Sequence, residues 1–349
     1  MIDRDLSSGL APGKEAVVAV EPTEPYWTEN LLFALYDPKA DIGFWLHLGS
    51  MPNDWGMWED RVLGCLPTEG TLTMWAYHRP QQAMKPAGAN LSFRCIEPFR
   101  RWRVDFDGYA QYVSDIAMQA GMAPDGLRRR LVIELDIDCA TPVWDAHAAA
   151  TSALGKGGMH SQNWAKEHYE QLYRARGRVL VDGEEIPFDG TGWRDHSRGP
   201  RGGPSGDPWG GHVIAGCLYP SGKAWIFSRY WKPDGTINLE GGCVVDGEGR
   251  FHFAEVVTAP RLSRLRMSGE RLPIGLRWPG GALNLEMTTR RSILTSFQKK
   301  LAVGTDLEGP GLMYVLNFGP CEWDGEIGQV YIERSEALNL PPVNLVAPG

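Results

Sequence analysis

The sequence predicts an all-β protein made of two tandem antiparallel β domains, each a barrel or a strongly curved sandwich. Runs of about five to nine residues rich in aromatic and branched side chains recur along the chain, and turn-forming residues bound each run. The 42 glycines and 25 prolines favour many turns over long helices. A length of 349 residues exceeds that of a usual single domain. Barrels are favoured because closure removes sheet edges and can enclose a ligand.

The first part of the chain contains a series of strand-like segments. The aromatic-rich runs between turn residues lie at 30–37, 42–49, 71–79, 90–97 and 102–108. A further segment alternates strictly, with Leu131, Ile133, Leu135 and Ile137 on one face and Val132, Glu134, Asp136 and Asp138 on the other. We expect this mostly acidic face to be solvated. The segment 109–122 fits either a helix or a long loop over a barrel mouth.

The expected linker between the domains is marked by a change of composition between Pro142 and Glu170. Small residues dominate there, and a helix-compatible piece occurs at 161–167. We therefore predict an N-terminal domain of residues 1–160 and a C-terminal domain of residues 161–349.

The predicted C-terminal domain begins with hairpins. Turns are expected at Asp182-Gly183, at Ser221-Gly222 and between Asp246 and Gly249. Segments 281–293 and 325–335 are the expected closing strands. No stretch predicts a helix longer than about three turns.

Composition and charge exclude several classes of partner and place the protein in the cytoplasm. The net charge of −8 argues against nucleic acid or an anionic membrane as a partner. No apolar run approaches the roughly 18 to 20 residues that span a bilayer, and the N-terminal residues do not resemble a signal peptide. The six cysteines are widely spread without a CxxC pair, which favours buried thiols in a reducing compartment over zinc ligands.

Common catalytic motifs are missing from the sequence. The Gly-rich stretch 199–211 opens no helix and carries no Gly-Lys-Ser/Thr, so a nucleotide cofactor is not expected. The eight histidines show no H-E-x-x-H or H-x-H spacing, and we expect no metal site. Ser197 lies outside any G-x-S-x-G elbow, which argues against a serine nucleophile.

The segment 190–201, "GTGWRDHSRGPR", concentrates more chemistry than any other part of the chain. In an extended strand, Arg194 and His196 face one side, and Trp193, Asp195 and Ser197 face the other. Asp195 and His196 reach one lumen only if the neighbouring glycines bend the strand. A buried Asp195 would have a raised pKa and could act as a general acid. A structural Arg–Asp pair that joins two strands is an equally good reading of the residues.

Two stretches of the sequence resemble a bacterial family of uncharacterised two-part proteins (DUF7064/DUF7065-like). They are residues 31–53 and residues 168–201, and the second contains a G-x-G-x-R-D-H-S-x-G-x-R motif. The motif is carried by Gly190, Gly192, Arg194, Asp195, His196, Ser197, Gly199, Pro200 and Arg201. Arg198 stands where the family has Trp, which suggests a more polar or anionic substrate. The family is remotely similar to tandem lipocalin-like proteins, including carotenoid 1,2-hydratase, AttH-like proteins and lipocalin-type Diels–Alderases.

The resemblance implies two lipocalin-like barrels and a cofactor-independent lyase or isomerase, such as a hydratase, dehydratase or cyclase. The expected substrate is a hydrophobic terpenoid, steroid or polycyclic molecule, and the 14 tryptophans suit an aromatic cavity for it. The expected catalytic residues are Asp195, His196 and Arg194, and the expected substrate-binding residues are Trp193, Trp209, Trp225, Tyr230 and Arg198. The alternative is a lipocalin-like carrier for apolar small molecules. A monomer or a homodimer fits either reading.

Overall fold

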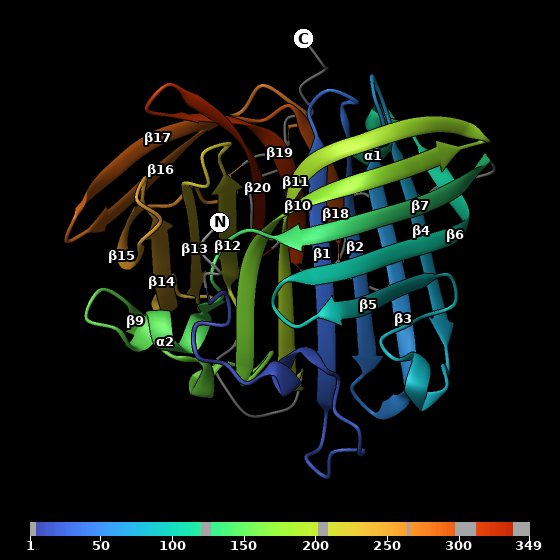
Figure 1. Cartoon of the computed structure of the whole chain (residues 1–349), viewed down its shortest axis with the longest axis horizontal. Coiled ribbons are helices and arrows are strands. Elements are labelled where there is room, and N and C mark those ends of the chain that lie inside the picture. The colour runs from blue at the N-terminus through green and yellow to red at the C-terminus, as the bar shows by residue number, and fades with distance from the viewer. Residues whose placement is uncertain (1–4, 120–126, 202–208, 264–265, 297–311, 338–349) are drawn as a thin grey trace.

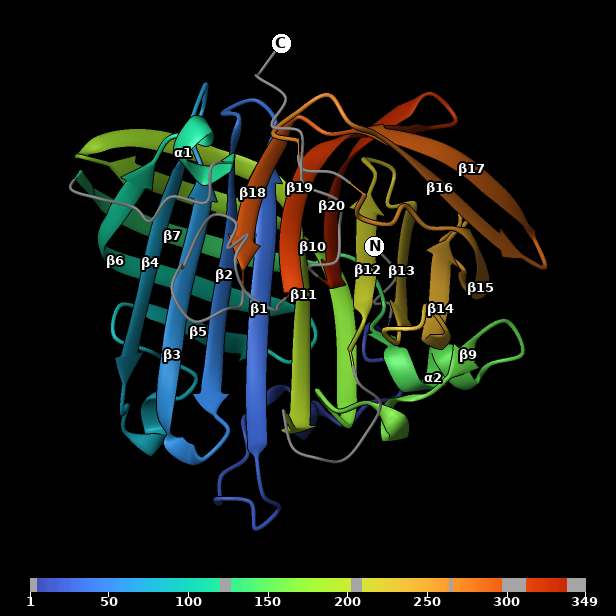
Figure 2. The ribbon, with the colours of Figure 1, turned by 180° about the vertical axis from the view of Figure 1, so that it is seen from behind.

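Two antiparallel sheets lie side by side and account for most of the structure (Figures 1 and 2). The computed structural model describes residues 5–119, 127–201, 209–263, 266–296 and 312–337. The first sheet, coloured blue to yellow-green in Figure 1, and the second sheet, coloured yellow to red apart from the green β9, each curve round a core of their own. This architecture confirms the predicted all-β fold with two barrels in tandem.

The first sheet forms a closed barrel. Its strands are β1 (Trp27–Asp37), β2 (Ile42–Met51), β3 (Asp54–Cys65), β4 (Thr71–His78), β5 (Leu91–Glu97), β6 (Arg101–Val113), β7 (Arg128–Cys139), β8 (Trp144–Asp145), β10 (Glu167–Val181) and β11 (Glu184–Pro200). Strand β10 pairs with β7 on one side and with β11 on the other, and β11 pairs with β1. The ring of strands is thereby complete. Strands β5 and β8 add short ladders outside it.

The second sheet also returns to its own first strands. It contains β9 (Lys156–Gly157), β12 (Gly211–Leu218), β13 (Ala224–Trp231), β14 (Ile237–Val245), β15 (Phe251–Thr258), β16 (Arg271–Trp278), β17 (Gly281–Thr288), β18 (Arg291–Ser296), β19 (Leu312–Trp323) and β20 (Glu326–Ala337). Strand β14 pairs with both β13 and β15. Strand β17 meets β19 at one residue pair, Met287 and Cys321.

Helices are short throughout the described residues. They are α1 (Asp115–Gln119) and α2 (Ala146–Thr151), with 3-10 turns at η1 (Pro12–Glu15), η2 (Gln82–Met84) and η3 (Met159–Ser161). The segment 109–122 is strand β6 up to Val113 and then α1, and its last residues lie outside the described part of the chain. The prediction of a helix at 161–167 is wrong, because this segment runs from the end of η3 to the start of strand β10. Helix α2 forms earlier, where the Asp145 carboxylate accepts a hydrogen bond from the Ala148 N–H at 2.7 Å.

The two sheets divide the chain at a different point from the predicted boundary at residue 160. Strands β10 and β11, which were expected to open the C-terminal domain, complete the first barrel instead. The main run of the second sheet begins with β12, although β9 joins its edge earlier in the chain. The closing partner of β11 is β1, far away in sequence, and local composition does not encode such a pairing.

The predicted hairpins occur where the turn residues place them. Strands β10 and β11 are joined by Asp182 and Gly183, with φ of 54° and 88°. Both residues therefore have the positive φ that a type I′ hairpin turn requires. The turns between β12 and β13 and between β14 and β15 likewise contain Gly222 and Gly249 at positive φ.

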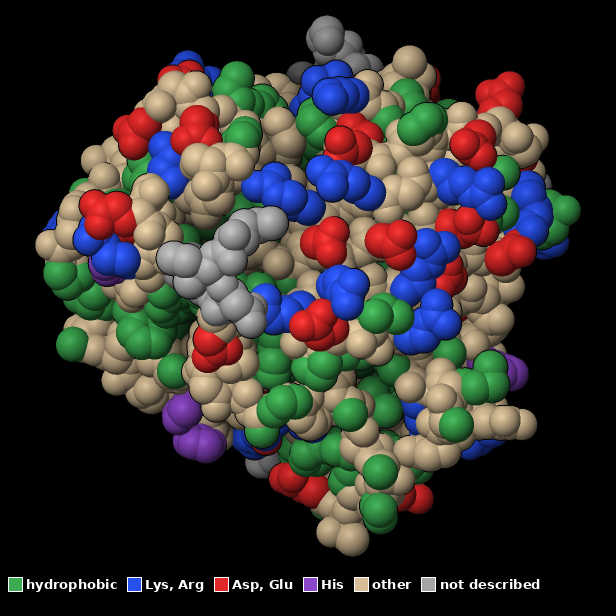
Figure 3. Space-filling model, viewed as in Figure 1, with side chains coloured by type: hydrophobic (Ala, Val, Ile, Leu, Met, Phe, Trp, Pro, Cys, Tyr) green, Lys and Arg blue, Asp and Glu red, His purple; other side chains and the backbone are tan. Residues whose placement is uncertain are grey.

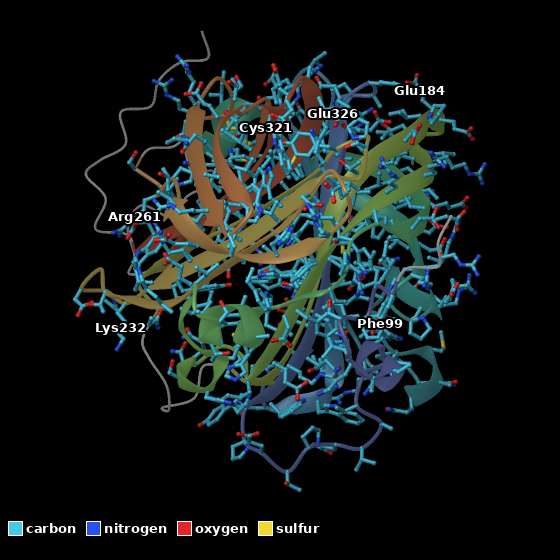
Figure 4. The ribbon with its side chains drawn as sticks, turned by 60° about the vertical axis from the view of Figure 1, so that its left-hand side comes forward. Phe99, Glu184, Lys232, Arg261, Cys321 and Glu326 are labelled. Atoms are coloured by element: carbon cyan, nitrogen blue, oxygen red, sulfur yellow. The ribbon has the colours of Figure 1, made fainter. Side chains whose placement is uncertain are left out.

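Each barrel has its own apolar core, and a third cluster lies between the barrels. On β1, Leu31 and Phe33 point into the first barrel, whereas Leu32 and Ala34 belong to the cluster shared with the second. Figure 4 shows the two halves meeting along this cluster, with Arg261 and Cys321 in one half and Phe99 and Glu184 in the other. Alternate side chains of the same strands therefore fill a barrel and build the contact between barrels.

The outer surface of the first barrel carries mixed charge. As predicted, Leu131, Ile133, Leu135 and Ile137 are buried, and Asp136 and Asp138 are exposed. Glu134 and Asp136 accept hydrogen bonds from Arg178 at 2.8 Å and from Arg103 at 3.3 Å. Figure 3 shows acidic and basic side chains intermixed on this face. Within the described residues there is no helix with the length and apolarity needed to cross a bilayer.

Candidate functional site

A cavity of about 320 Å³ lies between the two barrels. Side chains from β1, β2, β3, β4, β10 and β11 form one wall, and side chains from β12, β13, β19 and β20 form the other. Its aromatic lining consists of Trp45, Trp75, Trp164, Trp209, Tyr230 and Tyr314. The rings of Trp164 and Tyr230 stack with centroids 5.0 Å apart, which fixes this part of the wall. The volume suits a small organic molecule.

Strand β11 passes between β1 and β10 and supplies the acid of this cavity. Its side chains alternate between the interior of the first barrel and the contact with the second. Asp195 and Ser197 line the cavity, whereas His196 points into the first barrel. The strand therefore separates the neighbouring acid and histidine of the motif, as simple alternation predicts.

The Asp195 carboxyl has no hydrogen-bond donor among the described residues. Burial raises its pKa from the ordinary 3.8 to about 7, and the charges of His168 and Arg201 act in the opposite direction. Glu170 lies directly opposite Asp195 on β10, and Glu170 and Glu333 raise the pKa of Asp195 further. Asp195 can therefore hold or release a proton near neutral pH, which is the property that acid–base catalysis requires.

A histidine from the neighbouring strand faces the same cavity. His168 lies opposite Ser197, one diagonal step from Asp195, which corresponds to about 7 to 8 Å between Cα atoms. Its Nε2 is 2.8 Å from a Glu170 carboxyl oxygen, and its Nδ1 has no hydrogen-bond partner among the residues that the structure describes. Burial lowers the pKa of His168 and raises that of Glu170 well above its ordinary value. The indole N–H of Trp193 donates to the other Glu170 oxygen at 2.7 Å.

Two further His–carboxylate pairs line the cavity, and their carboxylates have several donors. Glu333 accepts hydrogen bonds from Tyr331 at 2.6 Å and Trp45 at 3.3 Å, and His212 Nε2 lies 2.9 Å from it. Glu59 accepts from Trp75 at 2.9 Å and lies 3.3 Å from His47. Burial alone would raise the pKa of both carboxyls, but these neighbours hold each below its ordinary value. Both groups are therefore ionised parts of the wall.

The other face of β11 is bound into a buried polar network inside the first barrel. Arg194 donates to Glu15 at 2.9 Å and to Gln171 at 2.6 Å. His196 lies 2.7 Å from both the Tyr169 hydroxyl and a Glu29 oxygen. The network connects the N-terminal segment to β1, β10 and β11. The roles expected for Arg194 and His196 beside Asp195 do not fit this geometry, because the strand backbone separates them from the cavity.

The expected substrate-binding residues divide in the same way. Trp209 and Tyr230 line the cavity, and Trp193 lies on its face of β11 but supports Glu170. Trp225 does not reach the cavity, because it points into the core of the second barrel. Arg198 also points away, with a guanidinium nitrogen 2.5 Å from the Lys14 carbonyl oxygen. No spacing pattern in the sequence marks His168, Glu170, His212 or Glu333 as cavity neighbours of Asp195, because they come from other strands. Arg201 belongs to the motif itself, but its residue type and position did not mark it as a cavity residue.

A serine lies close to one of the cavity histidines. Ser335 lies 2.5 Å from His212 Nδ1, which resembles part of a Ser–His–Glu chain. Its hydroxyl oxygen is buried and accepts hydrogen bonds from the Trp209 indole and the His212 backbone, so it is not presented to a ligand. Within the described ranges, no three or more His, Cys, Asp or Glu side chains form a group that could hold a metal ion.

The fold and the site define a two-barrel protein with an acid-bearing cavity between its barrels. Residues 12–258 match the family model DUF7064, a domain of unknown function, and the chain belongs to this family. This confirms the resemblance carried by the motif around Asp195. No curated protein matches the sequence closely enough to identify a relative.

Solved structures share the architecture at low sequence identity. A putative AttH from Nitrosomonas europaea is 14% identical, with 90% of this chain and 94% of that chain covered and a TM-score of 0.51. CghA, solved with Sch210972, is 8% identical, with 90% and 89% covered and a TM-score of 0.52. Kievitone hydratase from Nectria haematococca is 11% identical, with 92% and 93% covered and a TM-score of 0.47. The likenesses to the putative AttH and to CghA establish the lipocalin-like two-barrel fold predicted from the sequence.

Proposed function

We propose that the protein is a cofactor-independent lyase or isomerase in which Asp195 carries a proton to or from a carbon atom of a ring-containing small molecule. The observation that supports this most strongly is the Asp195 carboxyl, which lies in an aromatic cavity, has no hydrogen-bond donor in the described part of the chain and has its pKa raised to about 7 by burial. A structural carboxylate is normally saturated with donors, as Glu15 and Glu333 are. An unsaturated acid at this position is suited to reaction.

His168 is the second proton carrier in this proposal. Its Nδ1 takes a proton from the substrate or from water while Nε2 passes its own proton to Glu170, 2.8 Å away. The step starts with the proton on Asp195 and with Glu170 ionised. Because the pKa of Glu170 is raised and that of His168 lowered, a proton that reaches this pair stays on Glu170 and leaves both groups neutral in a buried site. Asp195 and the His168–Glu170 pair then form the acid and the base that such chemistry needs.

This pair of proton carriers suits two related reactions. In a double-bond isomerisation, Asp195 protonates one carbon and His168 removes a proton from another, so no atom is gained. In a hydration, Asp195 protonates one alkene carbon, His168 deprotonates water and the hydroxide adds to the other carbon. Proton transfer from His168 and Glu170 back to Asp195 resets the site in both cases. The solved complex of CghA with Sch210972 supports the idea that this fold can hold a ligand.

The test is turnover of a panel of terpenoid, steroid and polycyclic compounds in D2O, followed by mass spectrometry. We expect incorporation of deuterium, or gain or loss of water, with the native chain. Asp195→Asn should lower the turnover rate about a hundredfold or more, while the circular dichroism spectrum shows that the variant is folded. Asp136→Asn is the matched control, since Asp136 is 74% exposed on the outer surface.

Full activity of Asp195→Asn would contradict the proposal, and so would unfolding of that variant. Saturable binding without any conversion after long incubation would favour the alternative function, a carrier for apolar small molecules. The aromatic walls alone support that alternative, whereas the Asp195 environment favours the enzyme.

A further inference from the structure

Arg201 brings a positive charge to the cavity without an acidic partner. It lines the cavity beyond the end of β11, and no carboxylate of the described residues lies within ion-pair distance of its guanidinium. Two of the acids in the cavity wall already have their own donors: Glu333 has Tyr331 and Trp45, and Glu59 has Trp75. The third acid, Asp195, forms no ion pair with Arg201, although the charge of Arg201 lowers the pKa of Asp195. A partly buried cation without a counter-ion costs free energy unless a ligand supplies the negative charge.

The guanidinium is held in place by neutral groups. Its Nε donates to the Trp164 carbonyl oxygen at 3.1 Å, and one terminal nitrogen donates to the Ser197 hydroxyl at 3.4 Å. The Arg201 backbone N–H donates to the Tyr26 carbonyl at 2.9 Å. These contacts orient the side chain but do not neutralise it, so donors remain for a ligand. Such preorganisation reduces the entropic cost of binding.

The polar neighbours of Arg201 connect it to Asp195. Ser197 lies two residues after Asp195 on the same face of β11, a spacing of about 7 Å along a strand. The Ser197 hydroxyl lines the cavity and can donate a hydrogen bond to the same ligand atom as Arg201. One end of the cavity therefore presents a cation and a hydroxyl, and the rest presents aromatic rings together with the acid and histidine side chains described above.

We propose that the natural ligand is an amphipathic monoanion whose carboxylate, or ionised enol or phenol oxygen, binds Arg201 and Ser197. Its ring system then lies against the Trp and Tyr wall, with the reacting carbon beside Asp195. The proposal rests on the proposed function for the identity of the reacting end and specifies the substrate class further. The substrate is thus a ring compound with an acidic group a few bonds from the carbon that exchanges a proton. The anionic character first suggested by Arg198 is here assigned to Arg201.

The experiment compares two probes of the same shape. Isothermal titration calorimetry at neutral pH and low salt measures the Kd of 1-naphthoate, which is anionic, and of 1-naphthamide, which is neutral. We expect the native chain to prefer naphthoate by at least about tenfold, because a hydrogen bond to a charged group is that strong. Arg201→Gln should remove the preference and leave the naphthamide Kd within about twofold. Arg201→Lys should keep part of it, since the point charge remains.

Arg94→Gln is the matched control, because Arg94 is exposed on β5 and does not line the cavity. It should behave as the native chain. Equal affinity of the native chain for both probes would overturn the proposal. So would an unchanged preference in Arg201→Gln, a parallel loss of affinity for both probes in that variant, or no saturable heat from naphthoate.

The binding readout separates this proposal from the proposed enzymatic function. If Asp195 were not the proton carrier, Asp195→Asn would keep its turnover and naphthoate would still be preferred. If Arg201 were not the anion site, the preference would be missing while conversion still depended on Asp195.

Discussion

The two faces of strand β11 carry similar residues in opposite states. On the barrel side, Arg194 forms hydrogen bonds through Nε and one terminal nitrogen, and His196 forms them through both ring nitrogens. Their lengths range from 2.6 to 3.2 Å. On the cavity side, the Asp195 carboxyl has no donor among the described residues. The same strand, β11, thus contributes a hydrogen-bonded network to the barrel interior and an acid to the cavity. The two faces therefore differ in how far their polar groups are saturated with hydrogen-bond partners.

The largest expected effect comes from breaking the saturated face. Arg194→Met would leave Glu15 as a buried charge without its ion pair, which costs about 3 to 5 kcal/mol. Urea unfolding followed by circular dichroism measures this loss. Arg176→Met, at a pair with Asp189 exposed on both sides, should cost less than about 1 kcal/mol. Comparable stabilities of the two variants would contradict the structural role of the network.

On the cavity face of β11, replacement of Asp195 should increase the stability of the fold. The pKa of Asp195 is raised on folding from 3.8 to about 7, so ionisation costs the folded chain more than the unfolded chain. Native stability should therefore fall as pH rises from about 4 to about 7 and change little from this group above that. Asp195→Asn should match the native chain near pH 4 and exceed it by about 2 to 4 kcal/mol at pH 8. Urea unfolding at both pH values checks this, and a pH-independent difference would refute it.

Two histidines sharpen the comparison further. His168→Gln removes the proposed proton relay and should reduce turnover about a hundredfold, equivalent to about 2.7 kcal/mol, with a smaller effect on stability. His196→Gln should instead lower the free energy of unfolding by about 2 kcal/mol, because Glu29 and Tyr169 lose a buried partner. Turnover per folded molecule should then stay near the native value. Equal changes in turnover and in the free energy of unfolding for both variants would show that the two faces of β11 do not differ in role.

The smallest expected effects separate two tryptophans. Trp225 lies in the core of the second barrel. Trp225→Phe should therefore lower the free energy of unfolding by about 1 to 2 kcal/mol without changing the affinity for naphthoate. Trp209→Phe lies on the cavity wall and should weaken naphthoate binding a few-fold with little loss of stability. Calorimetric titration and thermal unfolding of both variants give the two readouts. Weaker naphthoate binding by Trp225→Phe would contradict the assignment of Trp225 to the core and not to the cavity wall.

Local patterns were sufficient to predict the strands, the hairpins and the two faces of β11. Alternation placed Asp195 and His196 on opposite sides, and Asp182-Gly183 identified a hairpin, because both depend on backbone geometry within a few residues. The barrel boundary was missed because β11 closes against β1. His168 and Glu333 were missed as cavity residues because the fold alone brings them to Asp195, whereas Arg201 was recognised only as a residue of the motif. Trp225 could not be told from Trp209 by residue type, since both are aromatic residues of the same half.

The position of the cavity on the outer walls of the barrels has a consequence for how new specificities arise. The width of a barrel lumen depends on strand number and shear, so enlarging it requires a new hydrogen-bond register. A space between two barrels is free of that coupling. Outward residues such as Leu32 and Ile214 can be exchanged while Leu31 and Val213 still fill their own cores. The two walls can diverge separately, and the same scaffold can accept differently shaped molecules without refolding.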